Sequence, residues 1–319
     1  MVASPKEKIA VGTHKLEVSN LDKVFYPATE FTKGDVIDYY RAISGVLLPH
    51  LKGRPVTLKR YPDGVEGFSF YEKACPDHRP SFIKTVAIRR RRDDKDVNYC
   101  QLNTEAAIVW AANLANLELH VAMGSARAPH KPHSVVFDLD PGEGTGVLEC
   151  AEVALRLRHL FSELERESVV KTSGSKGLQL YLPLNTKVTY EDTRPWAKEV
   201  ATRFEAETPE EIVSKPSKEA RRGRVFIDWS QNHSARTTVC VYSLRAIERS
   251  SRRSRKTQGR KGGPTVSTPV TWDEVTSALD AGDPERLVFT HDEILERVEA
   301  QGDLFEPVRT LKQRLPKLG

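Results

Sequence analysis

The stretch His133-Ser-Val-Val-Phe-Asp-Leu-Asp140 decides how the rest of this chain is interpreted. It predicts a buried strand that ends on two carboxylates, Asp138 and Asp140. Because successive side chains on a strand alternate between its faces, both carboxylates project to one side and Leu139 to the other. The run Pro141–Gly146 cannot extend the strand, so an open loop follows. Two hard oxygen ligands beside such a loop indicate divalent-metal binding, and ordinary acids on a solvated strand end are the alternative.

A third carboxylate, Asp228, lies in a second apolar run, Val225–Ser230. An unpaired charge among apolar neighbours is costly, so Asp228 needs a partner. A buried ion pair with a nearby arginine, such as Arg221, would supply one. Alternatively, three strand-borne aspartates can hold two divalent ions, the arrangement that stabilises both attacking and leaving oxygens in phosphoryl transfer. Asp138, Asp140 and Asp228 are therefore the candidate catalytic and metal-binding residues.

Residues 169–184 predict a hairpin whose turn is Ser173-Gly174-Ser175-Lys176-Gly177. Such a turn can cradle a triphosphate, because glycines let the backbone approach closely and Lys176 adds a compact charge. The turn is not a Walker A loop, since a strand rather than a helix follows the lysine. A hairpin turn with incidental polar residues is the alternative.

The composition is that of a globular protein, with a net charge that is mild for a protein that binds DNA. The chain has 319 residues, 39% hydrophobic and 29% charged, with a net charge of +5. No apolar run approaches the ~20 residues of a membrane span, and the N-terminus lacks a signal-peptide core. We therefore expect no membrane partner and a cytoplasmic, nucleoid-associated location. Four scattered cysteines suit a reducing compartment. Cys75, His78 and Cys100 have ligand-like spacing but lack a second close pair, so we interpret them as ordinary residues rather than a zinc site.

Helical and strand patterns interleave along the chain. Helical spacing predicts helices over 34–51, with Thr32 as cap, from Thr104 through Leu117, over 147–165 and over 190–207. Short strands are expected near residues 56–60, 68–72, 117–121, 135–140, 169–184, 225–230 and 239–242. The pattern predicts an α/β fold with mixed β-sheets flanked by helices.

Four motifs occur in one order: Phe137–Gly144, Thr172–Leu178, Asp228–Asn232 and Tyr242–Arg245. Together they resemble the polymerase domain of bacterial and archaeal end-joining DNA ligase D, in the archaeo-eukaryotic primase superfamily. The resemblance implies a primase-polymerase domain over 1–305, with an N-terminal lobe of about 1–115 and a catalytic lobe of about 116–305. A basic flexible insertion is expected at 249–263 and a C-terminal tail at 306–319.

The resemblance also implies a function: a template-directed nucleotidyltransferase that fills short gaps at DNA ends during non-homologous end joining. Such an enzyme uses NTP or dNTP substrates, prefers ribonucleotides, and needs two divalent ions, Mn²⁺ or Mg²⁺. The expected partners are gapped or overhanging duplexes with a 5′-phosphate, Ku and a separate DNA ligase. Both a stand-alone polymerase and a domain excised from a larger protein fit the sequence.

Carried over by position, the family's site residues fall into three groups. The metal ligands match Asp138, Asp140 and Asp228. The nucleotide-binding positions match Lys59, His120, Ser173, Lys176, Gln179, Gln231 and Arg245. The DNA-binding positions match Asn20, Lys23 and Lys33, as a pocket for the 5′-phosphate beyond a gap, and Arg60, Phe70 and Tyr71. Arg221 is a further DNA-binding candidate, because it belongs to a basic run that leads into the Asp228 strand and could bring a cation near template or triphosphate.

Gln179 departs from the family, which commonly has histidine there in contact with the triphosphate. An amide can donate a hydrogen bond but cannot become cationic, so we expect weaker triphosphate binding.

Three alternatives to end joining remain: primer synthesis, excision-repair gap filling, and a non-catalytic module that only grips DNA ends. A haloacid-dehalogenase-like phosphatase also carries Asp-x-Asp after a strand. Its motif continues to Thr or Val where Gly142 stands, and it would leave Asp228 unexplained.

Overall fold

The computed structural model describes residues 6–90, 95–249 and 262–319. The chain forms two compact units, each assembled from separate segments. Unit 1 contains residues 1–121, 239–266 and 290–302, and unit 2 contains residues 122–238, 267–289 and 303–319. Two segments from late in the chain, 239–266 and 290–302, thus belong to unit 1. The expected division into two consecutive lobes does not include this return.

Unit 2 is built on a six-stranded sheet in which the strand carrying Asp138 and Asp140 is central. Its pairings are antiparallel, apart from one parallel pair at the edge that begins with β15. In spatial order the strands are β15 (Ile212–Val213), β16 (Val225–Asp228), β12 (Ser134–Pro141), β14 (Leu178–Pro183), β13 (Val169–Thr172) and β20 (Pro269–Val270).

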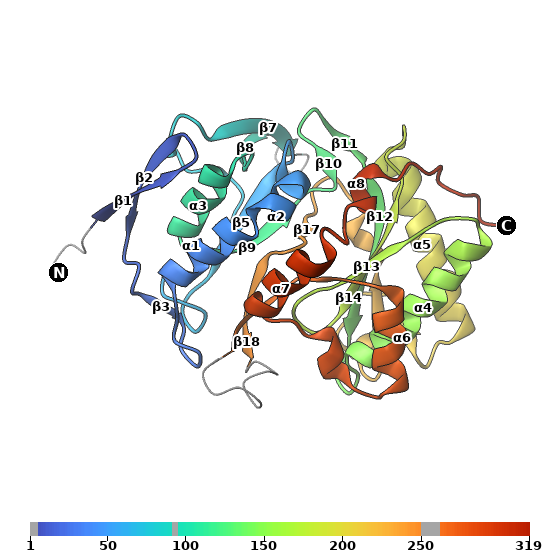
Figure 1. Cartoon of the computed structure of the whole chain (residues 1–319). Coiled ribbons are helices and arrows are strands. Elements are labelled where there is room, and N and C mark those ends of the chain that lie inside the picture. Colours follow the sequence, from blue (N-terminus) through green and yellow to red (C-terminus); the bar gives the residue numbers. More distant parts are fainter. Residues whose placement is uncertain (1–5, 91–94, 250–261) are drawn as a thin grey trace. The chain divides into compact units, whose positions relative to one another are not determined.

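One face of this sheet is apolar and is covered by helices (Figure 1). Val135, Phe137 and Leu139 of β12 point into that core, as the alternation of strand side chains requires. The ring of Phe137 lies 5.7 Å from Phe161 and 6.2 Å from Trp196. The covering helices are α4 (Val147–Glu163), α5 (Tyr190–Glu207) and α6 (Trp272–Asp280). The even-numbered residues of β12, including both aspartates, therefore belong to the opposite face.

Two glycines let the backbone close around the end of β12. A side chain at Gly177 would overlap the carbonyl oxygen of Leu139, and one at Gly142 would overlap that of Arg221. The neighbouring segments approach too closely to leave room for a Cβ atom. The loop after β12 and the turn after β13 are thus fixed against the strand that carries the aspartates.

Unit 1 contains a second six-stranded sheet, in which β6 pairs with β5 outside the main strand order. That order is β17 (Thr238–Val239), β9 (Asn116–Val121), β5 (Val56–Arg60), β8 (Lys95–Gln101) and β7 (Lys84–Arg90), with β6 at Phe70–Glu72. The helices of this unit are α1 (Lys33–Ala42), α2 (Ser44–Leu51), α3 (Glu105–Asn113) and α7 (His291–Gln301).

Shorter elements complete both units. In unit 1 these are β1 (Lys6–Val11), β2 (His14–Ser19), β3 (Val24–Tyr26), β4 (Phe31–Thr32), β18 (Leu244–Arg249) and β19 (Gly263–Val266). In unit 2 they are β10 (Gly124–Ser125), β11 (Ala128–Pro132), η1 (Glu219–Arg221), η2 (Trp229–Gln231), η4 (Pro284–Leu287) and α8 (Pro307–Thr310).

Most expected elements are present, and the differences have local causes. Thr32 caps α1 through a reciprocal capping box with Asp35. The single helix expected over 34–51 is two helices, because the chain turns at Ile43. The helix expected through Leu117 ends at Asn113, where Ala115 has a positive φ of 60° and β9 begins directly afterwards.

Residues 306–319, expected to be a tail, are held against unit 2. The side-chain amide of Gln313 donates to the carbonyl oxygens of Pro183, at 2.8 Å, and Glu167, at 2.9 Å. Leu315 and Leu318 pack against the core of the unit. The basic insertion expected at 249–263 falls largely on residues 250–261, which lie outside the described residues.

The interpretation of Cys75 and Cys100 as ordinary residues is wrong, because they form a disulfide. Their Cα atoms lie 4.8 Å apart, although the residues are 25 positions apart in sequence. The backbone N–H of Cys75 donates to the carbonyl oxygen of Asn98 at 2.7 Å, which places it beside β8. Cys150 and Cys240 are buried thiols. Within the described ranges, no helix is both long and apolar enough to cross a membrane.

Phe161→Ala should destabilise unit 2 by about 3–5 kcal/mol, because it removes a fully buried ring that contacts Phe137 and Trp196. The measurement is urea unfolding followed by tryptophan fluorescence. Ser162→Ala, on the exposed side of the same helix, is the control and should change stability by less than about 0.5 kcal/mol. Equal effects of the two substitutions would contradict the assigned core.

Candidate active site

A row of four polar side chains crosses the face of the unit 2 sheet that lies opposite the helix-covered core. Strand register places Asp228 of β16 opposite Asp138 of β12, Asp138 opposite Gln179 of β14, and Gln179 opposite Lys171 of β13. Asp140 lies two residues beyond Asp138 and so shares its face. The row therefore changes from two carboxylates through an amide to a cation within four adjacent strands.

Two glutamine amides hold the carboxylates in place. Gln179 Nε2 donates to Asp138 Oδ1 at 3.0 Å. Gln231, in the 3₁₀ turn that follows β16, donates through Nε2 to Asp228 Oδ2 at 3.0 Å and to Asp138 Oδ2 at 3.4 Å. The hydroxyl of Tyr181 donates to Gln179 Oε1 at 3.2 Å, which fixes the orientation of that amide. In this chain the residue in the family's histidine position thus directs its amide toward an aspartate.

The electrostatics of the row disfavour an ionised Asp138. Burial raises the pKa of Asp138 to about 7, and the charges of Asp140 and Asp228 act in the same direction. The hydrogen bond from Gln179 and the charge of Lys171 oppose this rise. Lys171 is fully buried, and its Nζ donates to Ser267 Oγ at 2.6 Å. A divalent cation at the carboxylates would relieve the repulsion that raises the pKa of Asp138.

The donor chemistry fits a hard divalent ion, since the three carboxylates offer oxygen ligands. Within the ranges that the structure describes, however, no three acidic, histidine or cysteine side chains are already gathered as a metal site. Asp228 Oδ1 instead accepts hydrogen bonds from Ser230 N at 2.9 Å and Ser230 Oγ at 2.6 Å. In the described part of the chain, the side-chain partners of Asp228 are thus Ser230 and Gln231 rather than a nearby arginine, the alternative that the sequence left open.

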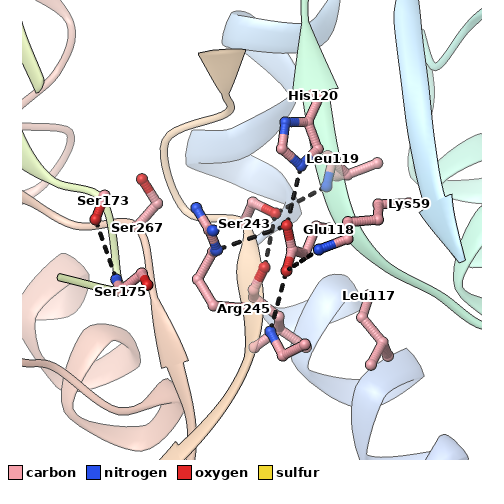
Figure 2. A network of polar contacts seen from close by, with 12 residues as sticks. Lys59, Leu117, Glu118, Leu119, His120, Ser173, Ser175, Ser243, Arg245 and Ser267 are labelled. Carbon is pink, nitrogen blue, oxygen red and sulfur yellow. Dashed lines mark hydrogen bonds and ion pairs between the residues drawn. The ribbon is translucent and has the colours of Figure 1, made fainter. Parts of the chain in front are cut away.

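The turn between β13 and β14 is organised by Ser173. Its Oγ accepts hydrogen bonds from the backbone N–H groups of Ser175 and Gly177, both at 3.2 Å, and Figure 2 shows the first of these. Lys176 lies exposed on this turn, which joins the strands that carry Lys171 and Gln179. Arg221 stacks its guanidinium 3.8 Å from the ring centroid of Phe226, which is the register partner of Asp140.

A second polar cluster lies in unit 1, on the sheet formed by β6, β5 and β9. Register places Lys59 of β5 opposite both Tyr71 of β6 and Glu118 of β9. His120 lies two residues from Glu118 and shares its face. Figure 2 shows the Glu118 carboxylate between Lys59, His120 and Arg245. The structure thus brings together the unit 1 residues assigned to the nucleotide around Glu118, an acid that none of the four sequence motifs contains.

Glu118 is almost completely buried, and both of its oxygens have partners. Tyr61 Oη donates to Oε1 at 3.0 Å and His120 Nε2 lies 3.0 Å from Oε2. Lys59 Nζ is 3.5 Å from Oε1, and Arg245 Nε is 3.6 Å from Oε2. Burial alone would raise the pKa of Glu118, but the hydrogen bond from His120 and the nearby cations hold it well below its ordinary value. Glu118 is therefore a carboxylate at neutral pH.

His120 is neutral under the same conditions. Burial lowers its pKa, the charges of Arg245 and Lys59 add to that effect, and Glu118 opposes it. Because a carboxylate only accepts hydrogen bonds, the neutral ring carries its proton on Nε2.

The other assigned DNA-binding residues lie in two places on unit 1. Arg60 and Phe70 are register partners on the face opposite Lys59 and Tyr71, with the Arg60 guanidinium 5.3 Å from the Phe70 ring centroid. Lys59 and Arg60 thus project from opposite faces of the sheet, and so do Phe70 and Tyr71.

Asn20, Lys23 and Lys33 lie around the start of α1. The N–H of Lys23 donates to the carbonyl oxygen of Asn20 at 3.1 Å, and that of Lys33 donates to the Lys23 carbonyl at 2.8 Å. Lys23 Nζ contacts Asp63 Oδ1 at 2.8 Å, whereas Lys33 Nζ donates to the Ser19 carbonyl at 2.6 Å. Burial, with a smaller effect of the charge of Lys23, lowers the pKa of Lys33 to about 8.

This α/β architecture, with strand-borne aspartates beside a serine-glycine-lysine turn, defines a primase-polymerase type of protein. Comparison with known proteins gives the family. Residues 32–305 match the family model described as LigD, primase-polymerase domain. The chain belongs to this family, as the motifs in the sequence indicated.

Individual relatives support the assignment. The chain is 38% identical over 296 residues to a multifunctional non-homologous end joining protein LigD from Mycolicibacterium smegmatis, covering 92% of this chain and 36% of that protein. It is 30% identical over 313 residues to a bifunctional LigD from Bacillus subtilis, covering 95% of this chain and 47% of that protein. The chain thus spans less than half the length of these curated relatives.

A solved structure supports the fold directly. The polymerase domain from Mycobacterium tuberculosis Ligase D, in complex with DNA, matches with a TM-score of 0.80 and 35% sequence identity. The match covers 93% of this chain and 99% of that one. The expected primase-polymerase fold is therefore confirmed.

Asp138→Asn should stabilise the protein in the absence of metal, by up to about 4 kcal/mol at pH 7.5. Folding raises the pKa of Asp138 from 3.8 to about 7, so the folded state holds a proton that the unfolded state has lost between these values. Wild-type stability therefore falls as pH rises through this window, and the variant, which cannot ionise there, escapes that loss. The advantage should shrink as pH falls toward 4.

Thermal unfolding between pH 4 and 8 tests this expectation. Mn²⁺ should then raise the Tm of the wild type but leave that of the variant nearly unchanged. A variant that is less stable at every pH, or equally stabilised by Mn²⁺, would contradict the electrostatic account of the row.

Proposed function

We propose that this chain is a template-directed nucleotidyltransferase that fills short gaps at DNA ends during non-homologous end joining. The observation that carries the proposal is the register row that sets Asp228 opposite Asp138, with Asp140 on the same face. Membership of the LigD primase-polymerase family supports it, as does the related polymerase domain that was solved with DNA. The proposed substrates are NTPs and dNTPs, with ribonucleotides preferred.

Asp138, Asp140 and Asp228 are the groups that would hold two divalent ions, Mn²⁺ or Mg²⁺. Such ions, when bound, neutralise charge on the attacking and leaving oxygens of an in-line phosphoryl transfer. Gln179 and Gln231 orient the carboxylates through their amide hydrogen bonds, so the ligands keep their position between turnovers. Lys176, exposed on the adjacent turn, supplies a positive charge for the departing pyrophosphate.

The polar side chains of unit 1 have two roles in this proposal. Lys59, His120 and Arg245 bind the incoming nucleotide, and Lys23 and Lys33 bind the 5′-phosphate on the far side of a gap. Tyr71 shares its face with Lys59, so it is the aromatic side chain suited to a base near the nucleotide. Phe70 and Arg60, on the other face, contact DNA elsewhere. Ku and a separate DNA ligase are the proposed protein partners.

Primer extension across a gap with a 5′-phosphate tests the proposal, with NTPs or dNTPs and Mn²⁺ or Mg²⁺. Asp138→Ala and Asp228→Ala should each reduce extension more than about 100-fold while DNA binding is retained. Asp280→Ala, an exposed acid of α6, is the control. Near-normal extension by either variant would overturn the metal assignment, and a wild type that binds ends without extending them would favour a non-catalytic end-binding module.

The pH dependence of gap binding should report the protonation state of Lys33. Because the pKa of Lys33 is about 8 in the folded protein, binding a phosphate above that pH requires a proton to be taken up. The preference for 5′-phosphorylated over unphosphorylated gaps should therefore weaken by up to about tenfold per pH unit above pH 8. Anisotropy titrations between pH 7 and 9.5 measure it, a range in which the terminal phosphate itself does not titrate.

Lys33→Arg provides the matched control, because an arginine keeps its charge throughout this range. Its preference should stay constant with pH. If the wild type is as constant as the variant, Lys33 does not bind the phosphate.

A further inference from the structure

We propose that Glu118 is a positioning residue for the nucleotide: it fixes Lys59, His120 and Arg245 in one arrangement without touching the ligand. The inference rests on the proposed function, in which these three side chains bind the incoming nucleotide. Three strands supply the cluster, with Lys59 on β5, Glu118 and His120 on β9, and Arg245 on β18. Figure 2 shows them converging on one carboxylate.

Burial argues that Glu118 supports the ligand-binding groups rather than binding a ligand itself. Its side chain is 2% exposed, whereas those of Lys59 and Arg245 are 21% and 17% exposed. An incoming anion therefore meets the cations first. Both carboxylate oxygens are already occupied by hydrogen bonds, including one from the backbone N–H of Ala246 to Oε1 at 3.2 Å.

The charges of the cluster also suit an anionic ligand. Lys59 and Arg245 together carry two positive charges and Glu118 carries one negative charge, so with a neutral His120 the cluster keeps a net positive charge. Without Glu118, the cluster would have no negative charge to offset the repulsion between Lys59 and Arg245. Lys and Arg side chains lose rotamer freedom when they bind, and a carboxylate that holds them beforehand removes part of that cost.

Glu118→Gln separates positioning from simple charge, because the two effects have opposite signs. Removing a negative charge makes the cluster more positive, which by itself would tighten the binding of a triphosphate. Replacing one of the two acceptor oxygens by an amide NH₂ group would weaken it, since that group now faces donors that the carboxylate aligned. We expect positioning to dominate, with KM for the nucleotide rising about 5- to 30-fold and kcat changing less than about threefold.

Equilibrium binding of ATP and of inorganic triphosphate, in the presence of Mn²⁺, gives a second readout that does not need catalysis. Both dissociation constants should rise in Glu118→Gln. If the wild type binds these ligands but never extends DNA, the proposed function fails while the inference about Glu118 is still tested. Glu118→Asp keeps the charge and should recover part of the lost affinity.

Glu248→Gln is the matched control in the same unit. Glu248 is also a carboxylate that gathers donors, from Ala28 N at 3.1 Å and from Thr29 N and Oγ1, both at 2.9 Å. These donors are uncharged, so the substitution removes a carboxylate that accepts several hydrogen bonds without removing the partner of a cation. It should leave KM and both dissociation constants unchanged, and thermal unfolding should verify that both variants are folded.

Tyr61→Phe covers the case in which Glu118→Gln does not fold. It removes one hydrogen bond to Glu118 Oε1 and leaves every charge in place. It should raise the dissociation constant for triphosphate about two- to threefold. The inference is overturned if a folded Glu118→Gln binds triphosphate as tightly as the wild type or more tightly, if Glu248→Gln weakens binding equally, or if Tyr61→Phe has no effect where it is the variant used.

Discussion

The antiparallel pairing of β12 with β14 and β16 is the constraint on which the candidate site depends. It aligns Asp138 with Gln179 on one side and with Asp228 on the other, three residues that are far apart in sequence. The same alternation sends Phe137 and Leu139 into the apolar core under α4 and α5. The burial of that core therefore fixes the register, because a slip by one residue would exchange the core face for the carboxylate face.

The two units handle buried carboxylates in opposite ways. In unit 1, Glu118 is surrounded by donors and cations, and its pKa lies below the ordinary value. In unit 2, Asp138 is held mainly by neutral amides beside two other acids, and its pKa lies above the ordinary value. Glu118 is thus satisfied within the fold, whereas burial and the two neighbouring acids disfavour the charged form of Asp138. The second arrangement is the one that the proposed reversible binding of a divalent cation would require, because a bound cation would offset the repulsion among the acids.

The local pattern of the chain predicted much of this arrangement. The shared face of Asp138 and Asp140 follows from a period of two, and the bounds of α5 and β5 agree with those expected from the sequence. The primase-polymerase fold, inferred from four ordered motifs, is confirmed by the family and by a solved relative. The roles assigned to individual residues remain predictions.

What the sequence could not supply is non-local. Glu118 and His120 lie two residues apart on β9 and so share one strand face, but the importance of Glu118 depends on the pairing of β9 with β5 and on its contact with Arg245 of β18. The Cys75–Cys100 disulfide likewise depends on how the segment before β7 folds back beside β8. Strand register, and the return of late segments to unit 1, are set by packing across long sequence separations.

Gly142 and Gly177 have a consequence for how this protein would respond to random mutation. Each lies where a neighbouring carbonyl oxygen occupies the space that a side chain would need. A selection that scores only loss of function would mark both positions as strongly as the aspartates, although neither glycine has a side chain to offer a substrate. Substitutions at these two positions would fail because the neighbouring backbone leaves no room for a side chain. A mutational map of the site would therefore need a stability measurement to distinguish such steric effects from the loss of a reacting group.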